Sequence, residues 1–184
     1  MKKVIFLGMM FLMALTVQAQ KRCVVLDFQV GSNVTVESGD AGGKAISSSK
    51  KTVSPGYTDL GLPSGTIWKN FNSAGFYGYD EAVSQFGNRL PSKAQWEELK
   101  AECQWSWTGS GYKVTGPNGN SIVLPAAGYR DCDGSVYVVG SGGYYWSSSP
   151  DGSEYAWRLH FSSSDLDISY KYRYYGYSVR LVQD

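Results

Sequence analysis

Residues 144–177 have the composition of a recognition surface. Eight of these 34 positions are Tyr and eight are Ser, and Trp146 and Trp157 lie among them. Tyr and Trp supply large, stiff contact area with a polar tip, while Ser supplies adaptable hydrogen bonds. A sheet core would favour Val, Ile and Leu, which are few in this segment. The segment therefore indicates binding of a protein or a glycan, although tyrosines also suit a strand with one solvated face.

The candidate ligand-binding residues are aromatic and charged side chains expected near the ends of the last strands. They are Tyr145, Trp157, Arg158, His160, Tyr170, Tyr172 and Tyr174. Interfaces concentrate their binding energy in a few residues, chiefly Trp, Tyr and Arg. One orientation stays open, because strict alternation puts Trp157 on the same face as Leu159 and Phe161, in the core. Arg173 and Arg180 are expected instead to tie loops to the sheet.

No catalytic or metal-binding arrangement stands out among the remaining residues. His160 is the one histidine, so a Ser-His-Asp triad around it is formally open, but its alternating strand pattern favours a structural role. The three cysteines, Cys23, Cys103 and Cys132, show no C-x-x-C spacing. Cys103 is expected to be a buried helix residue, with a Cys103–Cys132 disulfide as the alternative. We therefore expect no enzyme activity, no cofactor and no metal.

The first nineteen residues have the three parts of a secretory signal peptide. Lys2 and Lys3 are positive, residues 4–17 are apolar, and Val17-Gln18-Ala19 places a cleavage site after Ala19. The apolar run is too short to span a membrane, and no second run follows it. The protein is therefore expected to be exported to the periplasm, the cell surface or the medium. A net charge of +1, or −1 without the leader, argues against a nucleic-acid partner.

Local signals place the elements that would carry these residues. A helix is expected over residues 79–86, and a second helix starts after the N-cap Ser92, where Gln95 completes a capping box. A hairpin is expected over residues 112–124, and only short strands are expected after residue 144. Two early helices followed by a strand-rich half predict an α+β fold.

Composition divides the chain into three parts. Residues 1–19 form the signal peptide, and residues 20–56 hold a short strand (24–30) followed by a flexible linker rich in Gly, Ser and Lys. Residues 57–184 are expected to form the ligand-binding domain.

Three stretches resemble a known fold family. Residues 89–99 (RLPSKAQWEEL) are similar to the helix motif of the formylglycine-generating-enzyme, sulfatase-modifying branch of the C-type lectin fold, and residues 178–182 (SVRLV) resemble its closing strand. Residues 57–68 (YTDLGLPSGTIW) and 124–130 (LPAAGYR) resemble the major paralogous domain of exported Fibrobacter and Bacteroides proteins. The tail is also similar to the ligand-binding region of variable proteins made by diversity-generating retroelements.

The resemblance implies a C-type lectin-like fold with two helices, short antiparallel strands, and pairing between the first and last strands. The hairpin at Leu60 and Leu62 would then lie against Val179 and Leu181. The residues that give enzyme relatives their activity, a late cysteine pair or several histidines, have no counterpart here. The resemblance therefore favours binding over catalysis.

Two functional classes remain open. The first is an exported, non-catalytic recognition module that binds a protein or glycan through the Tyr/Ser/Trp-rich face. The second is a structural or accessory domain of a cell-surface assembly, such as a pilus or adhesin component. The family pattern turns Ala156, Leu159 and Phe161 inward, which would display Trp157 and its neighbours Arg158 and His160. The ligand and the oligomeric state stay open.

Overall fold

The computed structural model of this chain describes residues 51–183. The expected signal peptide (1–19), the short strand (24–30) and most of the linker lie outside the described residues. At the described end of the linker, the Gln183 side chain donates to the Thr52 carbonyl (2.9 Å) and accepts from the Ser54 amide (3.3 Å). Thr52 and Ser54 therefore contact the domain that composition predicted to begin at Tyr57.

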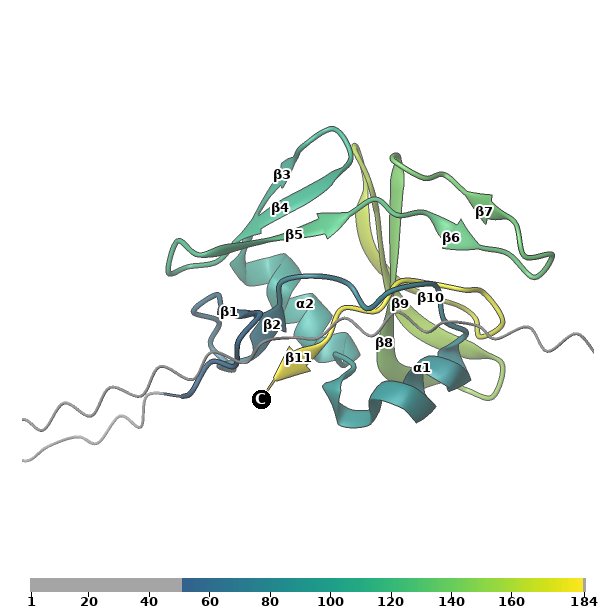
Figure 1. Cartoon of the computed structure of the whole chain (residues 1–184), viewed down its shortest axis with the longest axis horizontal. Helices are drawn as coiled ribbons and strands as arrows, with labels where there is room; N and C mark the ends of the chain where they lie inside the picture. The colour runs from purple at the N-terminus through teal and green to yellow at the C-terminus, as the bar shows by residue number, and fades with distance from the viewer. Residues whose placement is uncertain (1–50, 184) are drawn as a thin grey trace, which may run out of the picture. The chain divides into compact units, whose positions relative to one another are not determined.

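The described residues form an α+β fold with two α-helices and eleven short strands in four antiparallel sheets (Figure 1). The helices are α1 (Tyr79–Phe86) and α2 (Lys93–Glu102), and a 3₁₀ turn at Gly87–Arg89 lies between them. The sheets comprise β1 (Tyr57–Asp59), β2 (Ile67–Lys69) and β11 (Val182–Gln183); β3 (Gln104–Trp107), β4 (Gly111–Thr115) and β5 (Ser121–Pro125); β6 (Tyr129–Arg130) and β7 (Val136–Tyr137); and β8 (Gly142–Asp151), β9 (Tyr155–Ser162) and β10 (Leu166–Tyr172). The predicted fold class is confirmed at this level.

Both helices occupy the predicted residues. The Ser92 hydroxyl accepts from the Gln95 amide (3.2 Å), and the Gln95 side chain accepts from the Ser92 amide (2.8 Å), so the capping box is present. Trp96 and Leu99 lie fully buried on one face of α2. Within residues 51–183, neither helix is long and apolar enough to cross a membrane.

The ends of the described domain pair with each other. β2 lies between β1 and β11, and its Trp68 is opposite Val182 in the antiparallel register. The resemblance implied that Leu60 and Leu62 of the β1–β2 loop would lie against Val179 and Leu181. Instead, β11 pairs with Ile67 and Trp68 of β2. Leu60 of that loop packs in the cluster around Trp96, whereas Leu181 packs in a second cluster around Trp146.

Strands β8 and β9 separate these two clusters and are covered on both faces, whereas β10 is partly exposed. Tyr145 of β8 and its partner Leu159 of β9 face the cluster that includes α2. The neighbouring Trp146 faces the other cluster, which includes α1. Because successive side chains point to opposite faces, a strand buried on both sides loses the polar–apolar alternation that marks a half-buried strand.

Candidate functional site

Nine tyrosine rings form a continuous series of contacts around the end of β10. We call this the tyrosine band, and its members are Tyr129, Tyr137, Tyr144, Tyr155, Tyr170, Tyr172, Tyr174, Tyr175 and Tyr177. Two pairs are stacked with nearly parallel planes: Tyr172–Tyr174, with centroids 5.3 Å apart at 15°, and Tyr175–Tyr177, 5.8 Å apart at 5°. Such ring pairs contribute about 0.5–1.5 kcal/mol each beyond their burial, so they hold one another in place.

Part of the tyrosine band is exposed. Tyr170, Tyr172 and Tyr174 keep 52%, 38% and 54% of their surface accessible, although their rings touch neighbouring rings. The β9–β10 register positions the first two, because Tyr170 pairs with Trp157 and Tyr172 pairs with Tyr155. The structure therefore displays three of the predicted site residues together at the end of β10.

Tyr145 is a correction to the predicted site, because its side chain is 0% exposed. Its hydroxyl donates to the Pro125 carbonyl (2.7 Å) and accepts from the Asn72 amide (3.1 Å). Burial raises the pKa of this hydroxyl to about 12. Tyr145 thus belongs to the core, since β8 is covered on both faces and Tyr144 and Tyr145 point into opposite clusters.

Trp157 falls between the two orientations left open by the sequence. It shares a sheet face with Leu159 and Phe161, as strict alternation predicts. Those two residues are fully buried, whereas Trp157 is only half-buried. The ammonium of Lys93 lies 3.5 Å from the centre of its ring, and the ring meets Tyr170 edge-on. Trp157 therefore packs against Tyr170, in the exposed part of the tyrosine band.

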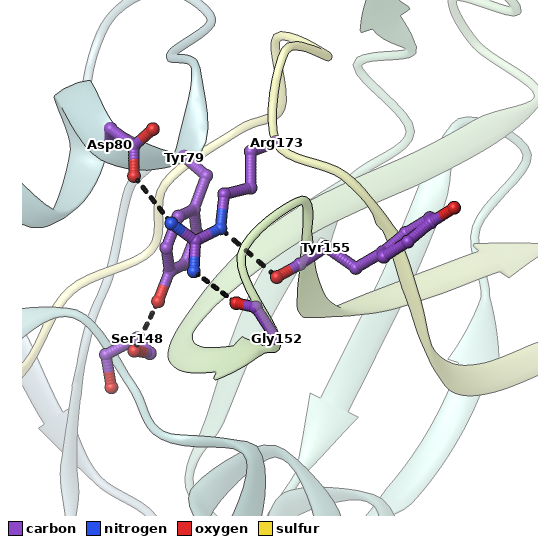
Figure 2. A network of polar contacts seen from close by, with 6 residues as sticks. All are labelled: Tyr79, Asp80, Ser148, Gly152, Tyr155 and Arg173. Atoms are coloured by element: carbon purple, nitrogen blue, oxygen red, sulfur yellow. Dashed lines mark hydrogen bonds and ion pairs between the residues drawn. The ribbon is translucent and has the colours of Figure 1, made fainter.

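Arg173 fastens the segment that carries Tyr172 and Tyr174 to the rest of the fold (Figure 2). Its Nη2 donates to the Gly152 carbonyl (2.8 Å) and its Nε to the Tyr155 carbonyl (3.2 Å), both beside the β8–β9 turn. Its Nη1 meets Asp80 of α1 at 3.2 Å.

The Arg173 guanidinium also lies 4.8 Å from the ring centre of Tyr79, whose hydroxyl donates to the Ser148 carbonyl (2.8 Å). These contacts join α1, the β8–β9 turn and the segment after β10 (Figure 2). The prediction that Arg173 ties a loop to the sheet is confirmed.

Arg180 also ties a loop to the sheets, as predicted, and its side chain is fully buried. Its three nitrogens donate to the Asn72 side chain (2.9 Å) and to the carbonyls of Lys69 (2.8 Å) and Val123 (2.6 Å). Burial lowers the pKa of this guanidinium to about 10. Arg180 therefore joins the segment before β11 to β2 and β5.

An open cavity of about 480 Å³ borders the exposed tyrosines. It is lined by Asp80, Ser153, Glu154, Tyr172, Arg173 and Tyr174. The aromatic faces therefore lie beside carboxylates and a hydroxyl.

A second cavity, of about 210 Å³, lies at the other end of the tyrosine band, and we call it the Arg158 cavity. Its walls are Arg158, His160, Lys171 and the rings of Tyr129, Tyr144, Tyr175 and Tyr177. Arg158 is 9% exposed, and its guanidinium carbon lies 5.3 Å from the ring centre of Tyr144 and 5.7 Å from that of Tyr177. Two predicted site residues, Arg158 and His160, thus line one cavity.

His160 is half-buried and stacks on Tyr144 with ring centres 4.8 Å apart. Its Nδ1 lies 3.4 Å from Asp165. Burial, followed by the charge of Arg158, lowers the pKa of His160 despite the opposing effect of Asp165. Burial therefore favours the neutral imidazole, and within residues 51–183 no serine hydroxyl is hydrogen-bonded to it.

Cys103 and Cys132 are both free thiols. Cys103 is buried at the end of α2, and burial raises its pKa to about 11. Cys132 is exposed in the β6–β7 turn. The buried-thiol expectation for Cys103 is confirmed, and the alternative of a disulfide is wrong. Among the described residues, no three His, Cys, Asp or Glu side chains gather into a group suited to a metal ion.

Sequence reasoning missed five residues of the Arg158 cavity: Tyr129, Tyr144, Lys171, Tyr175 and Tyr177. Tyr144 and Tyr177 lie in the Tyr-rich segment, but composition does not say which of two adjacent tyrosines faces which side. Tyr129 comes from β6 and reaches the cavity only through the tertiary fold. The alternation of Lys171 with Tyr170 and Tyr172 was the one usable signal, because it places Lys171 on the face of Arg158.

One family model matches part of the chain. It is described as a domain of unknown function, DUF8237, and it covers residues 97–182, just under half of the chain. The matched region runs from within α2 to β11, so it contains both cavities' strands and omits α1 and the β1–β2 hairpin. No curated protein and no solved structure shows significant similarity to the chain.

Proposed function

We propose that this chain is an exported, non-catalytic recognition module that binds a protein or glycan through the tyrosine band. The observation that carries the proposal is the joint display of Tyr170, Tyr172 and Tyr174. Each of these three side chains keeps more than a third of its surface exposed to water. Clusters of exposed aromatic side chains are typical of surfaces that bind a partner.

The display is pre-organised, which favours binding. Each exposed ring rests on another ring, and Arg173 holds the backbone between Tyr172 and Tyr174 through two carbonyls. Rigid side chains lose little conformational entropy when a ligand binds, so more of the contact energy appears as affinity. The serine and the carboxylates around them provide a polar rim.

The proposal includes a C-type lectin-like fold for residues 57–184. Its support is the motif resemblance together with the antiparallel pairing of β2 with β11, which that resemblance implies. Export rests on the three-part leader, because residues 1–19 lie outside the described residues. An experimentally determined structure would test the C-type lectin-like fold. Sequencing the N-terminus of the mature protein would test export.

Binding without catalysis is supported by the environment of His160. Its ring is stacked on Tyr144 and its Nδ1 faces Asp165, so it is placed as a wall of a cavity. A histidine that acts as a general base needs a nucleophile within hydrogen-bond reach, and the side chain of His160 contacts a tyrosine ring and a carboxylate.

The test is a ligand screen with matched variants. Full-length protein is screened on immobilised glycans and on surface extracts, and any ligand found is titrated against Tyr172→Ala and Tyr174→Ala. We expect each variant to weaken binding by about thirtyfold, the effect of losing roughly 2 kcal/mol at an interface hot spot. Circular dichroism should remain unchanged, because the displayed rings contribute little to the core.

Phe71→Ala is the matched control. Phe71 is 74% exposed and lies outside the tyrosine band, so its removal should leave binding within about twofold of the wild type, as for most interface-remote truncations. Equal losses in Phe71→Ala and Tyr172→Ala would contradict the proposed surface. So would unfolding of both tyrosine variants, since the rings would then be core.

A second function is favoured by the β6–β7 hairpin. Val136 and Tyr137 of β7 are exposed, as are Val138 and Val139 directly after it, and Val138 has a φ of 50°. A β-branched residue rarely adopts a positive φ, and such strain persists where the local shape is needed. The alternative is an accessory domain of a cell-surface assembly that packs on a subunit through this hairpin. Loss of co-assembly in Val139→Ser, with ligand binding intact, would favour it.

A further inference from the structure

The three arginines that contact the β8–β9–β10 region differ in how their nitrogens are satisfied. Arg173 and Arg180 each place all three guanidinium nitrogens on protein oxygens. Arg158 places none: its Nε and Nη1 are buried without a hydrogen-bond partner. No carboxylate within the described residues forms an ion pair with it. Unlike the other two arginines, Arg158 therefore has buried N–H groups that lack an acceptor.

The aromatic walls of the cavity do not supply hydrogen-bond acceptors for the guanidinium of Arg158. Tyr144 and Tyr177 attract the positive charge through their ring faces, which stabilises the guanidinium in place. The N–H groups of a guanidinium lie in its plane, however, and they require oxygen acceptors in that plane. A buried cation without an anion costs free energy, so such a group is retained where a partner arrives from outside.

The Arg158 cavity has the charge to receive an anion. Lys171 lies on its rim as a second cation, and its ammonium is 5.9 Å from the ring centre of Tyr175. Asp165 lies 3.4 Å from the Nδ1 of His160 and Asp167 is opposite His160 in the register, but neither carboxylate lines the cavity. Arg158 and Lys171 are the fixed charges that line the cavity, so the anion finds two cations there and no carboxylate in the walls.

The size and lining of the cavity favour a sugar over a peptide. About 210 Å³ holds the volume of about seven liquid water molecules, which suits the charged end of one small ring. The lining contains four tyrosine rings and no aliphatic side chain. Tyrosine offers a flat apolar face and a hydroxyl, whereas a peptide side chain usually enters a pocket with aliphatic walls. The hydroxyls of Tyr144 and Tyr177 make no hydrogen bond within the described residues.

We propose that the Arg158 cavity binds the anionic group of an acidic sugar, a pyranose ring that carries a carboxylate or a sulfate. The inference rests on the proposed recognition function and names its ligand class. The anion pairs with the guanidinium of Arg158 and with the ammonium of Lys171. The sugar ring lies against the tyrosines, and the exposed rings of Tyr172 and Tyr174 contact what extends beyond it.

The experiment titrates the full-length protein with four probes and follows the Arg158 Nε–H resonance by ¹⁵N NMR. The probes are methyl glucuronide, glucose 6-sulfate, the neutral methyl glucoside, and acetate. We expect at least one acidic sugar to shift this resonance and to bind about tenfold or more tightly than the neutral glucoside, as one charge-assisted contact provides. The two acidic probes decide between the carboxylate and the sulfate.

Two variants of equal charge change separate the local contact from the overall field. Lys171→Gln should weaken the acidic sugar by about threefold or more, whereas Lys100→Gln on the exposed face of α2 should leave it unchanged. Arg158→Lys keeps the charge and loses the planar fork, so it should weaken binding by about tenfold. Unchanged binding in both Lys171→Gln and Arg158→Lys overturns the proposal.

The remaining outcomes distinguish this inference from the proposed function. Equal binding of glucoside and glucuronide overturns the anion site, and acetate binding as tightly as glucuronide overturns the sugar in favour of a bare carboxylate such as a peptide end. A ligand that depends on Tyr172 and Tyr174 while neither acidic sugar binds removes this inference and keeps the recognition function. Acidic-sugar binding that is insensitive to both tyrosine variants supports the cavity and contradicts the displayed surface.

Discussion

Replacement of Arg173 by Gln tests whether one side chain holds the exposed tyrosines in place. The change removes charged hydrogen bonds to the carbonyls of Gly152 and Tyr155 and the contact with the Tyr79 ring. It also removes the pair with Asp80, which is an exposed carboxylate. The segment after β10 would then keep its ring contacts within the tyrosine band and its backbone contacts with α1 and the β8–β9 turn.

The expected cost follows from these contacts. A hydrogen bond to a charged group contributes about 1.5–3 kcal/mol, and the partial exposure of Arg173 argues for the lower end for each of the two carbonyls. The ring contact adds about 0.5–1 kcal/mol. Release of the ordered arginine side chain returns about 1–2 kcal/mol of entropy. We expect Arg173→Gln to lower the free energy of unfolding by about 1.5–3 kcal/mol, measured by urea denaturation.

Two comparisons make the result decisive. Asp80→Asn should cost about 0–1 kcal/mol, because an exposed ion pair contributes little. Arg173→Lys should cost nearly as much as Arg173→Gln, because an ammonium cannot reach two carbonyls in a fixed plane. Hydrogen exchange should quicken at residues 172–175 in both Arg173 variants. If Arg173→Gln costs less than about 1 kcal/mol, or if Asp80→Asn costs as much, the reasoning is refuted.

Four further outcomes are expected. Trp96→Ala should cost about 3–5 kcal/mol in urea denaturation, since the ring is fully buried; a neutral result would remove α2 from the core. Because burial lowers the pKa of His160 below its unfolded value of 6.5, the unfolded state binds more protons in acid, so wild-type stability should fall between pH 7.5 and 5.5 more steeply than that of His160→Gln; parallel profiles would contradict this. A thiol reagent at pH 8 should modify Cys132 in the native protein and Cys103 only after unfolding, as read by peptide mapping. N-terminal sequencing of the secreted protein should begin at Gln20; an intact leader on the secreted chain would exclude the cleavage site.

The parts of the fold that were predictable have local causes. The start of α2 is encoded within four residues, because Ser92 and Gln95 exchange hydrogen bonds across one turn. The α+β class followed from the same kind of signal. Arg173 and Arg180 were recognisable as structural, since a long planar cation in a loop-rich domain commonly ties carbonyls together.

The site was less predictable because two of its strands, β8 and β9, are covered on both faces whereas β10 is partly exposed. Tyr144, Tyr145 and Trp146 are consecutive, and the sequence alone does not tell which of them faces which cluster. The exposed Tyr170 and the buried Tyr145 have identical chemistry, and only the tertiary fold separates them. Tyr129 reaches the Arg158 cavity from a separate sheet, so no spacing rule links it to Arg158.

The pairing of β2 with β11 has a consequence for how the protein is made. Ile67 and Trp68 must wait for Gln183 and Val182, which leave the ribosome after every other described element. The three-stranded sheet is therefore closed by a contact of very long sequence separation, and the entropy of closing that loop is lost before any β2–β11 interaction forms. A nascent chain that stops short of β11 leaves β2 with an unpaired edge. The β1–β2–β11 sheet therefore stays incomplete until β11 has been synthesised.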